Sequence, residues 1–96
     1  MKIWDSMKKM MVKLVEVVHN NYSDQFHLQE IIVNSAHVVS IKADDETAGI
    51  HAKGHLPEGL HKAQQFSKIT FTNGKEIVVV GAPSIIGAKA KNILHG

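Results

Sequence analysis

The clearest alternation of apolar and polar residues lies near the C-terminus, between Lys68 and Val80. The apolar positions on the two sides of Asn73-Gly74 recur at every second residue, at Ile69, Phe71, Ile77 and Val79. Asn-Gly supplies the two positive-φ residues of a type I′ turn, so this pattern predicts a β-hairpin. The run Ile77 to Val80 is apolar at every position, which indicates a strand that is central or covered by a helix.

Three more strands are expected before the hairpin. Val12 to His19 is rich in β-branched residues, which favour strands, although its apolar residues also recur at near-helical spacing. Phe26 to Val33 and His37 to Ile41 have a similar composition. Turn-forming residues at 20–24 and 34–36 separate the three segments. Short, closely spaced strands of this kind are typical of an antiparallel meander.

The segments outside these strands follow no strand pattern. Residues 1–10 are expected to form a flexible or helical extension. Residues 42–67 carry an acidic run at 44–46, followed by several glycines and a proline, and we expect a long loop. Within it, Gly59 to Phe66 is compatible with a short helix. After Gly81-Ala82, Pro83 fits the first turn of a helix that runs to about Leu94.

Together these elements predict one α+β domain over residues 1–96. Its antiparallel sheet has about five strands, arranged as a meander plus the C-terminal hairpin. The C-terminal helix is expected to pack across the sheet. A length of 96 residues and a hydrophobic content of 44% suit a single core.

Composition narrows the chemistry. The chain has no cysteine, which excludes disulfides, thiolate metal sites and cysteine nucleophiles. No signal peptide is evident and no run of eighteen apolar residues occurs, so we expect a cytoplasmic protein without a membrane partner. All eleven basic residues are lysine. Because the guanidinium group of arginine is the preferred bidentate donor to phosphate and to guanine, its absence disfavours sequence-specific binding of nucleic acid.

The seven histidines raise the question of a metal site. His51 and His55 have the spacing that places two imidazoles on one helical face, which suits zinc. Gly54 and Pro57 argue against a helix there, so exposed loop histidines are the simpler interpretation. The serines lack a nucleophile-elbow motif. We therefore expect no catalytic residue, no metal ligand and no cofactor.

The polar face of the C-terminal hairpin is the best candidate for a ligand site. It offers lysine for phosphate and an amide for ribose, close in sequence to an aromatic ring that could stack on a base. The competing interpretation is an ordinary polar sheet face with Phe66 in the core. The candidate ligand-binding residues are Phe66, Lys68, Asn73, Lys75 and His61.

Several segments, in their order along the chain, resemble a family of small phage proteins of unassigned or anti-defence role. They include Leu28 to Asn34, the segment Leu56-Pro57-Glu58-Gly59-Leu60, and Ile77 to Pro83. The resemblance extends to the Thoeris anti-defence sponges, and it implies a non-enzymatic, oligomeric protein that sequesters cyclic ADP-ribose isomers in the host cytoplasm. It also implies a ligand near the long loop and the final hairpin. The sponges are expected to bind phosphates through arginine side chains, and this chain has no arginine.

The leading hypothesis is therefore a non-catalytic phage-type protein that captures a small nucleotide or blocks a host protein, as a homo-oligomer. The first alternative is a nucleic-acid-binding regulator that uses lysine contacts. The second is a small metal-dependent enzyme built on the loop histidines.

Overall fold

The computed structural model describes the backbone of residues 10–95 and the side chains as far as Lys89. These residues form one antiparallel sheet and two α-helices. The expected extension at residues 1–10 therefore lies outside the described residues except for Met10. Along the chain the elements are β1 (Met11–Asn20), β2 (Gln25–Asn34), the 3-10 turn η1 (Ser35–His37), β3 (Val38–Ala43), α2 (Asp45–Ala52), β4 (Phe66–Phe71), β5 (Glu76–Val80) and α3 (Pro83–His95). The expected α+β class is confirmed, and so are the five strands.

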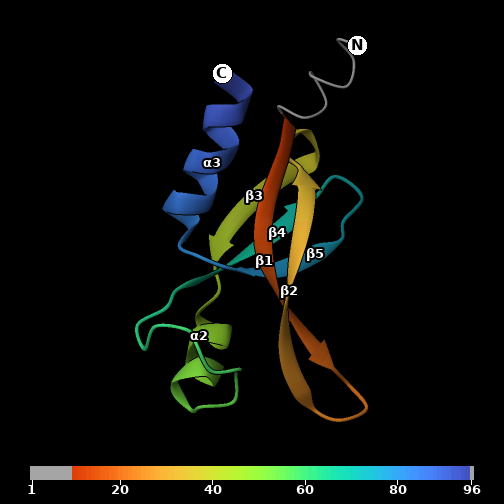
Figure 1. Cartoon of the computed structure of the whole chain (residues 1–96). Coiled ribbons are helices and arrows are strands. Elements are labelled where there is room, and N and C mark those ends of the chain that lie inside the picture. Colours follow the sequence, from red (N-terminus) through yellow and green to blue (C-terminus); the bar gives the residue numbers. More distant parts are fainter. Residues whose placement is uncertain (1–9, 96) are drawn as a thin grey trace.

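The order of strands across the sheet is β2-β1-β5-β4-β3, with every neighbouring pair antiparallel (Figure 1). The predicted meander of the first three strands is therefore wrong, because β3 lies at the opposite edge from β2. The cause lies in β5, whose apolar residues face both sides of the sheet and need a central position. β5 takes the place beside β1, and η1 redirects the chain after β2 toward the far edge.

The β1–β2 hairpin is long and crosses the rest of the sheet. β1 and β2 pair over all ten residues of each strand, from Met11↔Asn34 to Asn20↔Gln25. β1 pairs with β5 only at Glu16↔Val79 and Val17↔Val78. Beyond this crossing the hairpin continues away from the sheet, toward the level of α2 (Figure 1). The hairpin tip, residues 21–24, is thus placed near a helix that is distant in sequence.

The main cluster of buried apolar side chains lies on one face of the sheet, beneath α3. Alternate residues of β1, β2, β4 and β5 point into it, and α3 adds one buried isoleucine. Burial of each such side chain stabilises the fold by about 1.5–3 kcal/mol before the entropy of folding is counted. The buried cluster consists of Val12, Leu14, Val33, Ile69, Ile77, Val79 and Ile86.

Helix α3 begins at Pro83, as predicted, and packs against β1, β3 and β4. The approach is close at Gly81, whose φ is +128°. A Cβ atom at this position would lie 3.0 Å from Cδ1 of Ile86. Glycine therefore serves both the backbone conformation and the packing of α3 at this junction.

The segment 42–67 differs from the expected loop, because α2 occupies Asp45–Ala52. Asp45 and Glu46 lie in its first turn, where carboxylates interact favourably with the positive end of the helix dipole. The short helix considered over 59–66 is absent from the described chain, which turns there until β4 begins at Phe66.

The turn between β4 and β5 also differs in type from the prediction. The Gly74 amide donates to the Phe71 carbonyl at 2.9 Å, and Gly74 has a φ of +84°. Asn73 is not in the positive-φ region, so the type I′ prediction is wrong. Instead its side-chain oxygen accepts from the Lys75 amide at 2.9 Å. One positive-φ glycine after a β-turn is the pattern of a longer hairpin loop.

In the described part of the chain, neither helix has the length and apolar character needed to cross a membrane.

Candidate functional site

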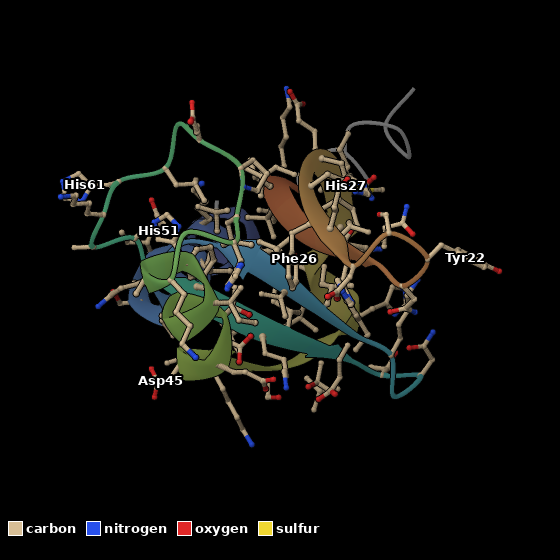
Figure 2. All side chains as sticks on the ribbon, turned by 90° about the horizontal axis from the view of Figure 1, so that it is seen from below. Tyr22, Phe26, His27, Asp45, His51 and His61 are labelled. Carbon is tan, nitrogen blue, oxygen red and sulfur yellow. The ribbon has the colours of Figure 1, made fainter. Side chains whose placement is uncertain are left out.

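A cleft of about 900 Å³ opens between the tip of the β1–β2 hairpin and α2. We call it the hairpin–helix cleft. Lys68 of β4 and Val78 of β5 contribute to it from the sheet. The hairpin contributes His19, Asp24, Gln25 and Phe26, and the opposite wall is formed by Asp44, Glu46, Thr47, Ile50, Gly54, His55, Leu56 and Pro57. In Figure 2 the side chain of Phe26 lies between the hairpin and α2, whereas Tyr22 points away at the hairpin tip.

The hairpin wall is shaped by its four-residue turn. The Asn20 side-chain oxygen accepts from the Tyr22 amide at 2.9 Å, and Asp24 adopts a left-handed φ of +54°. An Asp24 carboxylate oxygen then lies 2.8 Å from Nε2 of His19. The His19 ring stacks on Phe26, with ring centroids 4.6 Å apart. The result is an aromatic pair with a carboxylate fixed beside it.

The helix wall is fixed by the start of α2. The Asp44 amide donates to the Phe66 carbonyl at 2.9 Å, which ties this wall to β4. The Thr47 hydroxyl donates to the Asp44 carboxylate, and Thr47 is buried. Glu46 is exposed on the same turn. Two carboxylates therefore line the cleft from this side.

The loop after α2 is held by one histidine. Nε2 of His51 donates to the His61 carbonyl at 2.7 Å. The His51 ring also meets Phe66 edge-on, with centroids 5.7 Å apart. Leu56 is buried, so the loop segment that lines the cleft is anchored by apolar packing as well.

The charges of the cleft are predominantly negative. Its lining includes three carboxylates, Asp24, Asp44 and Glu46, but a single ammonium group, that of Lys68. Carboxylates accept hydrogen bonds from amino groups and attract cations, whereas they repel phosphates. The imidazoles of His19 and His55 add groups that can donate or accept.

The structure does not bring the five candidate ligand residues together. Lys68 lines the hairpin–helix cleft. Asn73 and Lys75 line a second groove of about 480 Å³, beside the end of β2. Phe66 is 1% exposed, in agreement with its interpretation as a core residue. His61 is exposed and lies on the outer side of the loop (Figure 2).

The hairpin wall was not among the predicted site residues, although the chain carries a signal for it. His19 and Phe26 flank the polar turn residues, and the pairing of β1 with β2 places them directly opposite each other. Opposite residues of an antiparallel pair share a face and lie about 4.5–5.5 Å apart. A four-residue turn at 21–24 is thus sufficient to predict the aromatic pair.

Among the residues that the structure describes, no group of three or more histidine, aspartate or glutamate side chains is arranged to hold a metal ion. Comparison with known proteins finds no matching family model, no matching curated protein and no matching solved structure. We therefore base the function on the hairpin–helix cleft alone.

Proposed function

We propose that this chain is a non-catalytic small-molecule-binding protein whose ligand is a planar, nitrogen-rich ring such as a nucleobase. The observation that carries the proposal is the stacked His19–Phe26 pair beside Asp24, inside a cleft with two further carboxylates on its opposite wall. An aromatic surface with adjacent acceptors is suited to a flat ring that carries amino groups.

The size of the cleft supports this class of ligand. A volume of about 900 Å³ lies within the range of pockets that hold drug-sized molecules. A nucleoside can stack its base near Phe26 and still place its ribose above the sheet. Gln25 adds an amide that can donate to ribose hydroxyls or accept from them.

The charges of the cleft rank the ligands within this class. Asp24, Asp44 and Glu46 favour neutral or positively charged ligands. Lys68 can pair with one phosphate, but a second phosphate would meet carboxylates. A cyclic ADP-ribose signal, as implied by the phage-family resemblance, is thus a weaker fit than a nucleoside. The same carboxylates disfavour the nucleic-acid-binding alternative.

The test is a thermal-shift and NMR titration of the full chain with adenosine, guanosine, cyclic ADP-ribose and spermidine. A ligand at one hundred times its Kd stabilises the folded state by about 2.7 kcal/mol. We expect stabilisation by at least one nucleoside, with amide shifts at residues of the cleft. If neither nucleoside nor cyclic ADP-ribose changes the melting temperature or the spectrum, the proposal fails.

Two variants locate the ligand. Phe26→Ala should weaken binding at least tenfold, because it removes half of the aromatic pair. Tyr22→Ala is the matched control, since Tyr22 is fully exposed at the hairpin tip and points away from the cleft. Equal losses in both variants would place the ligand elsewhere.

A charge variant separates the ligand classes. Asp44→Asn should weaken any binding of spermidine and strengthen any binding of cyclic ADP-ribose, because it removes one negative charge from the cleft wall. The same direction of change for both ligands would show that the charges of the cleft do not select the ligand.

A further inference from the structure

The two edges of the sheet are built differently. The β3 edge is short, with six residues, and its pairing with β4 is interrupted between Val38 and Ser40. The β2 edge has ten residues, paired with β1 without any shift of register. Within the described residues, no strand pairs with the outer side of either edge.

An open edge presents unpaired N–H and C=O groups that can pair with another strand. Proteins usually protect such edges with bulges, lysines, prolines or short strands. β3 carries a register shift and Lys42, whereas β2 contains neither lysine nor proline. The single acidic residue of β2 is Glu30, which is paired with Lys13 at 2.9 Å. β2 is therefore the edge that the sequence leaves available.

We propose that β2 pairs antiparallel with β2 of a second copy of this chain, across a two-fold axis, to form one continuous sheet. A two-fold interface uses the same surface twice, and one strand of this length can match itself. Opposite residues in a sheet must point to the same face, so the axis must pass through a residue and not between two.

Charge selects the residue on the axis. An axis at Glu30 would place the two Glu30 carboxylates directly opposite each other, which is unfavourable. An axis at Gln29 gives an overlap of the same length and places Gln29 opposite Gln29. Leu28 then lies opposite Glu30 of the second copy. This arrangement avoids every like-charge pair within β2.

The same register suits the apolar residues. Ile32 is 63% exposed in the single chain and lies opposite Phe26 of the second copy in this arrangement. Because Phe26 also lines the hairpin–helix cleft, Ile32 of the second copy would lie beside the mouth of that cleft.

Cysteine pairing tests the register directly, because the chain has no cysteine of its own. In Gln29→Cys the two new residues lie opposite each other, within the Cα separation of 4.4–6.8 Å that a disulfide needs. In His27→Cys, the matched control on the same face, the two cysteines are about 14 Å apart. We expect at least tenfold more disulfide-linked dimer for Gln29→Cys under mild oxidation. Equal yields, or none at position 29, would overturn the proposal.

Opposite charges at one position give a second measurement. Leu28→Glu places a carboxylate opposite Glu30 of the second copy, and this happens at two places in each dimer. Leu28→Lys places an ammonium group opposite Glu30 of the second copy instead. Sedimentation of the unmodified chain and of Leu28→Lys should give twice the mass of 10.6 kDa, and Leu28→Glu should give a single copy. A single copy for the unmodified chain at 100 µM, or the same mass for both variants, contradicts the proposed dimer.

Discussion

His51 on α2 donates to the backbone carbonyl of His61, with 2.7 Å between Nε2 and the oxygen. This bond joins the helix to the far end of the loop that follows it, ten residues away. The loop between them includes Leu56 and supplies part of the wall of the hairpin–helix cleft. The His51 side chain therefore helps to hold the wall in position, together with the buried Leu56.

His51→Ala should lower the free energy of unfolding by about 1 kcal/mol, the usual net value of one hydrogen bond. Amide hydrogen exchange over residues 53–65 should become faster, since the loop loses its attachment. Lys62→Ala is the control, because Lys62 is exposed in the same loop and its substitution keeps the His61 carbonyl that accepts the bond. The idea is wrong if both variants speed exchange over this loop to the same extent.

Two glycines should respond in opposite directions to the same substitution. Gly81→Ala should lower the free energy of unfolding by about 1–3 kcal/mol, because its φ of +128° disfavours a side chain. The new Cβ would also press on Ile86. Gly49→Ala should raise the free energy of unfolding by about 0.5–1 kcal/mol, since Gly49 lies inside α2 with no neighbouring atom within 4 Å of the added Cβ. Urea denaturation of both variants measures these changes, and a shift of equal sign would contradict them.

Lys13 and Glu30 form an exposed ion pair at 2.9 Å, and the hydrogen bond and charge of Glu30 raise the pKa of the Lys13 amine above its usual value of 10.5. A raised pKa in the folded state means that folding favours the charged amine. The pair's contribution to stability is therefore fully present below the ordinary lysine pKa. It is lost as the pH rises through the raised pKa of Lys13 in the folded state. NMR titration of the Lys13 side chain should show this pKa falling in Glu30→Gln. Asp45→Asn, far from the pair in sequence, should leave it unchanged.

The strands were predictable because the residues within each strand and the turn residues beside it are enough to indicate a strand. β-Branched runs and turn residues place β1, β2 and β5 within one or two residues of their observed ends. Helix α2 was missed because its apolar residues form no stripe and Gly49 interrupts it. The positions of β3 and β5 were not predictable from neighbouring residues, because the pairing of β1 with β5 joins residues more than sixty positions apart.

The candidate site was likewise predictable only where it depends on residues that are close in sequence. Phe66 and Lys68 share one face of β4, as the alternation of the strand requires, so their grouping was reasonable. The two residues differ in environment because α2 covers Phe66, whereas Lys68 lines the cleft. Asn73 lies on the turn at the far end of β4, by the groove next to β2. The aromatic pair of the cleft depends on the register of β1 and β2, which the sequence encodes only through the length of their turn.

The narrow join between β1 and β5 has a consequence for how the chain assembles. The β1–β2 hairpin and the β3–β4–β5 unit each consist of pairings between strands that follow one another along the chain, which form more quickly than pairings between distant strands. The two units share only the pairs Glu16↔Val79 and Val17↔Val78. Their association therefore depends on side chains such as Leu14 and Ile69 meeting in the core more than on backbone hydrogen bonds. We expect the hairpin and the rest of the sheet to form as two early units whose apolar surfaces join last.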